Sequence, residues 1–263
     1  MAHVPALTFT NEVVCPAAQT REYLERSRLA VARLALGCHS QVANEAVPRD
    51  LSWPCLKARK AHLKLSYEGR LRLMLLLHRK LRVFDYVHRN CIRTRWSKRL
   101  QHVSRMYGFY VNPVKEDNEW KWAEAVKTQV RLSETDTWWR NMQKKATRRI
   151  YRERKQEAFL EPLFDNSVAS SLLFEAGDGA LRTLAYSQRF YDSVDRAMYR
   201  MCGAVKETIE HLVVNCRDLT TVPTDGTTFP QALSFSSSDV PKGDGVNATK
   251  KQLNKWWTKV RSR

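Results

Sequence analysis

The sequence predicts a mainly α-helical protein, on three observations. Apolar residues recur at spacings of three and four along several stretches, as they do on one face of a helix. Alternation of apolar and polar residues, the pattern of a half-buried strand, is absent at any useful length. Breaks such as Asn112-Pro113 and Pro162 fall between the periodic stretches, where proline ends helices.

The composition limits the class of protein. With 263 residues and 43% apolar side chains, the chain can bury a core, which excludes a disordered polypeptide. No run of apolar residues is long enough to span a membrane, and residues 1–19, which we expect to be irregular, lack the pattern of a secretory signal. The six cysteines do not form a dense disulfide framework. We therefore expect a protein of the nucleus or cytoplasm, not secreted, with reduced thiols.

The net charge of +18 is concentrated in one segment. Residues 51–115 hold sixteen basic side chains against two acidic ones, Glu68 and Asp85. Such an excess favours phosphate backbones or an anionic membrane surface, because without an anion it costs self-repulsion. The alternative is a pair of core helices with a solvated basic face. We expect nucleic acid, either RNA or DNA, and no membrane, because Trp and Tyr interleave with the basic residues over several helices.

Two helices are expected in this segment. The first covers residues 58–88, which contain no proline, and Gly69 weakens it. The second follows Thr94 and ends before Gly108, because glycine is common just after a helix end. The side chains that we expect to contact nucleic acid are Arg70, Arg72, Arg93, Arg95, Trp96, Lys98, Arg99 and Arg105.

Further helices are expected beyond the basic segment. A sequence like a capping box at residues 133–136 predicts a long helix that begins there and continues to about Phe159. A helical region at 170–190 is broken by Gly177-Asp178-Gly179, and a short helix covers 208–215. Residues 220–246, rich in Ser, Thr, Pro and Gly, predict a flexible linker, and residues 247–263 a basic amphipathic tail.

The patterns of the common catalytic sites are missing. Polymerases and nucleases hold two metal ions with clustered carboxylates, and this chain contains no Asp-Asp pair. It also contains neither a Walker-type loop nor a nucleophile elbow. We therefore expect no Mg²⁺ site and no enzymatic activity in this chain.

The best-defined motif is Cys202-x8-His211-x4-Cys216. Thiolate and imidazole side chains at this spacing are typical zinc ligands. A complete site would begin with a cysteine at position 199, where the chain has Tyr199, and a phenol that is protonated at neutral pH is a poor ligand. Two interpretations stay open: a weak Zn²⁺ site with three protein ligands, or a vestigial loop in which Cys202 and His211 simply pack.

The motif lies within a stretch that resembles a known family. Residues 199–203 (YRMCG) and 207–216 (ETIEHLVVNC) resemble the C-terminal zinc knuckle of LINE-like (non-LTR) retrotransposon reverse transcriptase polyproteins, in which position 199 is a cysteine. Residues 33–38 and 44–53 resemble the region just beyond the polymerase domain of this family. Other short blocks are similar to arthropod members, the tick transposon proteins especially; they are residues 68–72, 93–97, 165–167, 172–176, 249–253 and 256–257.

The resemblance implies a division of the chain and a function. Residues 20–110 would form a basic, helical, thumb-like region, 111–198 a helical linker region, and 199–219 a degenerate zinc knuckle before a flexible C-terminal tail. The parent enzymes carry out target-primed reverse transcription, but their palm motif (Tyr or Phe, then Ala-Asp-Asp) has no counterpart here. We expect a nucleic-acid-binding fragment. The alternatives are a non-functional translated relic with residual fold, and a basic protein associated with membrane surfaces.

Overall fold

The computed structural model describes residues 16–73, 82–84, 86, 87, 90, 92, 94–109, 119–145, 148, 151, 152, 155, 164–188, 202, 206–219, 228–233, 235 and 243–262. Within these residues the regular structure is helical and no strand occurs, which confirms the prediction of a mainly α protein. No helix among them has the length and apolar character that a membrane crossing needs. The chain forms two compact units: unit 1 comprises Met1–Ser27 and Pro54–Arg140, and unit 2 comprises Arg28–Trp53 and Asn141–Arg263.

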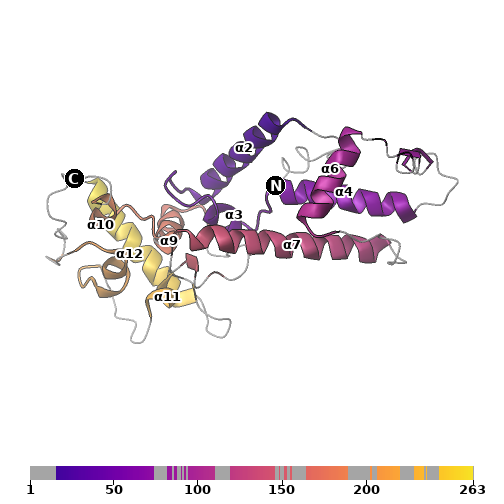
Figure 1. Ribbon diagram of the computed structural model, residues 1–263. Helices are drawn as coiled ribbons and strands as arrows, with labels where there is room; N and C mark the ends of the chain where they lie inside the picture. The colour runs from indigo at the N-terminus through magenta and orange to yellow at the C-terminus, as the bar shows by residue number, and fades with distance from the viewer. Residues whose placement is uncertain are drawn as a thin grey trace. The chain divides into compact units, whose positions relative to one another are not determined.

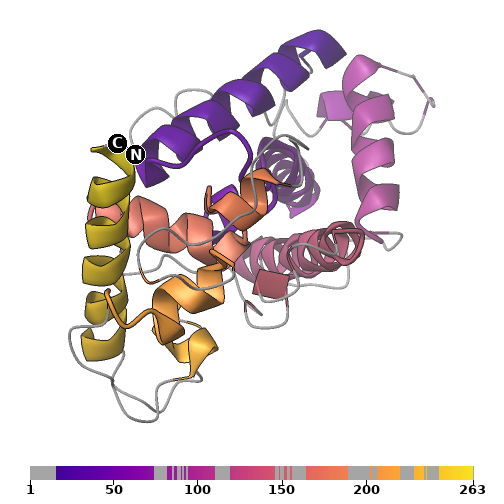
Figure 2. The ribbon, with the colours of Figure 1, turned by 90° about the vertical axis from the view of Figure 1, so that its left-hand side faces the viewer.

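Unit 1 is built on three packed helices. They are α4 (Leu56–Leu73), α6 (Arg95–Met106) and most of α7 (Glu119–Gln143). Helices α4 and α7 run alongside each other, and α6 crosses them (Figures 1 and 2). The start of α2 (Ala18–Leu36) also belongs to unit 1. The shared core consists of Ala58, Ala61, Leu65, Leu100, Val103, Tyr107, Trp122, Val126 and Val130.

Helix α6 begins and ends where the sequence predicts. The hydroxyl of Thr94 accepts a hydrogen bond from the backbone N–H of Ser97 at 3.0 Å, which caps the first turn. After Tyr107 the chain leaves the helix at Gly108, whose φ of +76° favours glycine. Leu100 and Val103 face the core, so the basic side chains of this helix occupy its other sides.

Helix α7 differs from the prediction at both ends. It begins at Glu119, passes through residues 133–136 without a break, and ends at Gln143. Asp136 does not cap a new helix but pairs with Arg140 one turn later, at 3.0 Å. The predicted helix start at 133 is therefore wrong. A Ser-x-x-Asp sequence is compatible with a helix interior when its polar groups find partners on the same helix or in a neighbouring element.

Gly69 is required by the packing of α4 against α7. The indole N–H of Trp122 donates a hydrogen bond to the carbonyl of Leu65 at 2.9 Å, in a buried position. A Cβ atom at residue 69 would overlap with the indole ring. The sequence marks Gly69 as a weak point of the helix, but its tertiary role is to let the tryptophan approach the helix backbone.

Besides the ends of α2 and α7, unit 2 contains α3 (Ala46–Asp50), α9 (Val168–Asp178), α10 (Leu184–Ser187), the π-helical turn η3 (His211–Asn215), α11 (Phe229–Ala232) and α12 (Gly243–Arg261). Helix α12 packs against α9, η3 and α11 (Figure 2). The core is formed by Leu172, Leu173, Ala176, Leu181, Leu212, Val213, Cys216, Leu219, Ala232, Leu233, Val246, Leu253 and Trp256.

Two predicted boundaries in unit 2 are confirmed. Helix α9 ends at Asp178, and Gly179 follows with a φ of +74°, which agrees with the break predicted at residues 177–179. The short helix predicted at 208–215 is present as a helical turn at 209 and 210 followed by η3.

The flexibility predicted for the linker and the tail is wrong where the structure describes them, whereas the basic amphipathic pattern predicted for the tail is confirmed. Within 220–246, helix α11 begins with a capping box, in which Gln231 Oε1 accepts a hydrogen bond from the backbone N–H of Thr228 at 2.8 Å. The tail is helix α12, and its Leu253 and Trp256 are fully buried. Polar composition predicted flexibility here, whereas a few apolar side chains are enough to hold both segments on the core.

We expect Gly69→Ala to destabilise the protein by about 1–3 kcal/mol, because the added methyl group overpacks the Trp122 contact. This cost opposes the gain of about 1 kcal/mol that alanine brings to a helix interior. Urea denaturation followed by tryptophan fluorescence and circular dichroism measures the difference. In a Trp122→Leu background the same substitution should become neutral or stabilising. A stabilising effect in the wild-type background would contradict the packing described.

Candidate metal centre and nucleic-acid interface

The structure brings the three residues of the predicted zinc motif together. The ligand atoms of Cys202, His211 and Cys216 all lie within 4.8 Å of one another, and the Cys202 sulfur is 3.1 Å from His211 Nε2. Within the described residues, no other group of three or more His, Cys, Asp or Glu side chains has this arrangement. A tetrahedral zinc ion bound at about 2.0–2.3 Å holds its ligand atoms about 3.5–3.8 Å apart. The geometry is therefore compatible with a metal ion after small side-chain movements.

The turn η3 positions two of these ligands. The backbone N–H of Cys216 donates a hydrogen bond to the carbonyl of His211 at 2.7 Å, which ends the turn and places the thiol beside the imidazole. The backbone N–H of His211 is in turn held by the hydroxyl of Thr208 at 3.1 Å. Cys216 is fully buried in the unit 2 core, whereas Cys202 and His211 are half-buried. Tyr199, the predicted fourth position, lies outside the described residues.

Helix α6 carries a basic stripe on its exposed side. Arg95, Lys98, His102 and Arg105 recur every three or four residues, and all four side chains are exposed. Partial desolvation, followed by the charges of Arg99 and Lys57, lowers the pKa of His102. The smaller, coulombic part of this shift comes from neighbouring cations.

Other predicted contact residues take part in packing within unit 1. The ring of Trp96 meets the rings of Tyr67 and Phe84 edge to face, at centroid distances of 6.4 and 6.0 Å. Arg72 pairs with Glu68 at 2.7 Å and lies over Phe84, and Arg70 lies over Tyr67. These side chains therefore stabilise the end of α4 as well as adding charge. Arg93 lies outside the described residues.

The carboxylates of unit 1 make contacts inside the unit. Glu134 accepts hydrogen bonds from Tyr107 at 2.7 Å and from Cys55 at 2.9 Å. Glu25 accepts one from the backbone N–H of Leu56 at 3.1 Å, at the start of α4. Further ion pairs of unit 1 join neighbours on one helix: Glu22 with Arg26, Glu68 with Arg72, Glu124 with Lys127, and Asp136 with Arg140.

The sequence reading missed a second group of basic residues in unit 1. Lys57, Lys60 and Lys64 share one face of α4 and line a pocket together with Arg21 and Arg99. The spacing of three and four among the lysines is visible in the sequence. Their meeting with Arg21 is a tertiary contact that no local pattern reveals.

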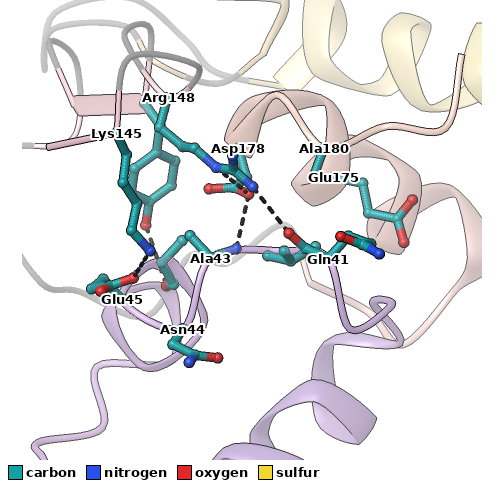
Figure 3. Close-up of polar contacts among 12 residues, drawn as sticks. Gln41, Ala43, Asn44, Glu45, Lys145, Arg148, Glu175, Asp178 and Ala180 are labelled. Carbon is teal, nitrogen blue, oxygen red and sulfur yellow. Dashed lines mark hydrogen bonds and ion pairs between the residues drawn. The ribbon is translucent and has the colours of Figure 1, made fainter. Parts of the chain in front are cut away.

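A buried polar network in unit 2 was also missed. Figure 3 shows Arg148 between Asp178 and the carbonyl of Gln41: its Nε is 3.4 Å from Asp178 Oδ2, and it donates to Gln41 O at 3.0 Å. The same Asp178 oxygen accepts the backbone N–H of Ala43 at 3.1 Å. Beside it, Lys145 pairs with Glu45 at 2.6 Å. These contacts tie the chain around residue 43 to α9 and to residues that follow α7.

His39 and Glu175, which lie beside this network, have structural roles. His39 Nδ1 accepts the backbone N–H of Gln41 at 3.0 Å, and Nε2 lies 2.9 Å from the carbonyl of Ala180, to which it donates. Both ring nitrogens of a neutral imidazole are thus used, so the ring is not available as a general base. Burial lowers the pKa of His39 and raises the pKa of Glu175 to about 7 and that of Asp178 to about 6.

Comparison with models of known protein families, with curated proteins and with solved structures finds no match for this chain. The fold and the two candidate sites therefore rest on the residues and their geometry.

We expect unit 2 to lose stability as the pH rises from about 4.5 to 7. The folded state raises the pKa of Glu175, so the stabilisation is complete below the pKa of the unfolded chain and is lost as the pH passes the folded value. The resulting decrease in unfolding free energy is at most about 3 kcal/mol. Glu175→Gln should flatten the dependence of unfolding free energy on pH in this window, as measured by urea denaturation.

Asp165→Asn serves as the control, because the fold shifts the pKa of this carboxyl in the opposite direction from that of Glu175. Hydrogen bonds from Ser167 and Ser170 lower the pKa of Asp165, so its stabilisation is present at neutral pH and is lost only as the pH falls below about 4. This variant should leave the slope between pH 4.5 and 7 unchanged. The same slope in wild type and Glu175→Gln would contradict the buried carboxyl described.

Proposed function

We propose that this chain binds nucleic acid through the basic surface of unit 1, as the post-polymerase region of the LINE-like reverse transcriptases does. The observation that carries the proposal is the exposed stripe of Arg95, Lys98, His102 and Arg105 along α6. A second part of the proposal is that the chain has no polymerase activity of its own. It requires a protein of the nucleus or cytoplasm, where nucleic acid is accessible.

The way α6 is held suits binding to a phosphate backbone. Its apolar side is fixed by Leu100 and Val103 in the core, and the Thr94 cap fixes its first turn. The basic side chains are therefore presented from a rigid element. Side chains three and four apart on a helix have Cβ atoms about 5–6 Å apart, comparable to the spacing of successive phosphates. Contacts of this kind give affinity and orientation but no base sequence preference.

The charge balance of the basic segment supports the same proposal. Residues 51–115 hold sixteen basic side chains against two acidic ones. A surface with such an excess of cations attracts polyanions.

We expect Arg95→Gln/Lys98→Gln/Arg105→Gln to weaken binding to RNA and DNA and to make it less dependent on salt. Each lost phosphate contact removes about 0.9 from the log–log salt slope on duplex DNA and about 0.7 on single strands. Fluorescence anisotropy with labelled oligonucleotides from 50 to 200 mM salt measures both. The matched control is Lys121→Gln/Lys127→Gln/Arg131→Gln, which removes the same charge from the exposed side of α7.

The outcomes of this experiment separate the alternatives. Equal loss of affinity in both triple variants would show that net charge, not the α6 surface, governs binding. Binding to vesicles that contain anionic lipid, without binding to oligonucleotides, would favour the membrane-surface alternative. Absence of binding to either would favour the relic. Template-dependent primer extension by the purified chain would contradict the absence of polymerase activity.

A weak zinc site is the second function that we propose, and it rests on the grouping of Cys202, His211 and Cys216. Three protein ligands with water as the fourth bind zinc less tightly than four closed ligands. The other described thiols are poor competitors, because burial raises the pKa of Cys38 and of Cys55 to about 12. A metal here would fix the segment around Cys202 to η3 and would supply no catalysis.

We expect Co²⁺ titration of the full chain to show weak binding through its tetrahedral thiolate spectrum. Binding should be tighter in Tyr199→Cys and lost in Cys202→Ser. The added thiolate completes a four-ligand site, and the serine removes a ligand that the structure places 3.1 Å from His211. Cys38→Ser is the control and should titrate as wild type. Equal affinity of wild type and Tyr199→Cys would show that another residue already completes the site.

A further inference from the structure

A concave pocket in unit 1 gathers basic side chains from three helices. Its walls are formed by Arg21 of α2, by Lys57, Lys60 and Lys64 of α4, and by Arg99 of α6. The lysines are three and four residues apart, so they stand on one face of α4. Pro16, Ala61, Val103, Met106 and Tyr107 complete the lining. The pocket differs from the exposed stripe of α6 because it is concave and its cations converge.

Two of these lysines are buried. The exposed fraction of the side chain surface is 8% for Lys60 and 3% for Lys64. The base of the pocket is apolar, since Ala61, Val103 and Tyr107 belong to the unit 1 core. For Lys60 this burial is costly, because removing an ammonium group from water disfavours its charged form.

The cations of the pocket repel one another. Burial lowers the pKa of Lys60, and the charges of Arg21, Arg99 and Lys64 lower it further. Glu25 acts in the opposite direction, but its Oε2 accepts the backbone N–H of Leu56 at the start of α4. Three of the pocket's cations therefore act against the charge of Lys60, and an anion bound among them would relieve this repulsion.

We propose that this pocket binds a phosphate group, held by Lys57, Lys60, Lys64, Arg21 and Arg99. A phosphate carries up to two negative charges and several acceptor oxygens, which match converging ammonium and guanidinium groups. That the phosphate belongs to a nucleic-acid strand rests on the proposed function.

The first experiment tests the pocket with inorganic phosphate alone. Thermal unfolding of the full chain is measured in phosphate and in chloride at equal ionic strength. Bound phosphate stabilises the folded state, so Tm should rise with phosphate concentration. Lys57→Gln/Lys60→Gln should lose this rise, and the matched control Lys121→Gln/Lys127→Gln on α7 should keep it. A wild-type protein that responds equally to both salts, or the same rise in all three proteins, would overturn the proposal.

The stability of the variant in chloride adds a second readout. Removing two mutually repelling cations should leave Tm unchanged or raised, whereas loss of a purely structural contact would lower it. Arg21→Gln, on a different helix, should also weaken the response to phosphate. If the double variant does not fold, this single variant decides: an undiminished response in Arg21→Gln would overturn the proposal.

The second experiment distinguishes the source of the phosphate. If the pocket holds a backbone phosphate, Lys57→Gln/Lys60→Gln should weaken single-stranded oligonucleotide binding by roughly fivefold near 0.15 M salt and reduce the salt slope by about 0.7–0.9. Unchanged oligonucleotide affinity, with the response to inorganic phosphate lost, would confirm the pocket and assign it to a free phosphate or a phosphorylated small molecule. If wild type does not bind oligonucleotides, the proposed function fails and the thermal experiment still decides the pocket.

Discussion

In unit 1, Arg21, Lys64 and Arg99 lie close enough to Lys60 to disfavour its charge, and the fold has to hold these side chains together against that repulsion. The apolar contacts of α4, α6 and α7 supply the opposing free energy. Their arrangement depends on the contact of Trp122 with the backbone of α4 at Leu65, which residue 69 permits by lacking a side chain. The core thus fixes the helices, and the helices fix where the charge accumulates.

Two acids of unit 1 serve its packing. Glu134 joins Tyr107 and Cys55, and Glu25 satisfies the first N–H of α4. Donors removed from water need such acceptors. The positive field of unit 1 follows from its composition, since residues 51–115 hold sixteen basic side chains against two acidic ones, and this excess is the basis of the polyanion binding that we propose.

In unit 2, buried carboxyl groups rather than clustered cations are the main polar feature. Its buried carboxyls, Glu175 and Asp178, connect the segment around Ala43 to α9 by hydrogen bonds from backbone N–H groups and from Arg148. The turn η3 brings His211 and Cys216 together against the apolar core of the same unit. The carboxyl contacts join parts of the chain that are far apart in sequence, whereas the metal-site residues are close in sequence, so a metal at Cys202 would add to a scaffold that is already packed.

The sequence by itself determined the helical class, the limits of α6, the break at Gly179 and the spacing of Cys202, His211 and Cys216, because all of these depend on local caps, glycine backbone angles or residue period. It failed where partners are distant. Helix α7 passes through residues 133–136, and α12 is part of the core, because tertiary contacts outweigh local composition. Only the folded chain decided that Lys60 and Lys64 share a pocket with Arg21, since charge density along a sequence does not say which charges converge.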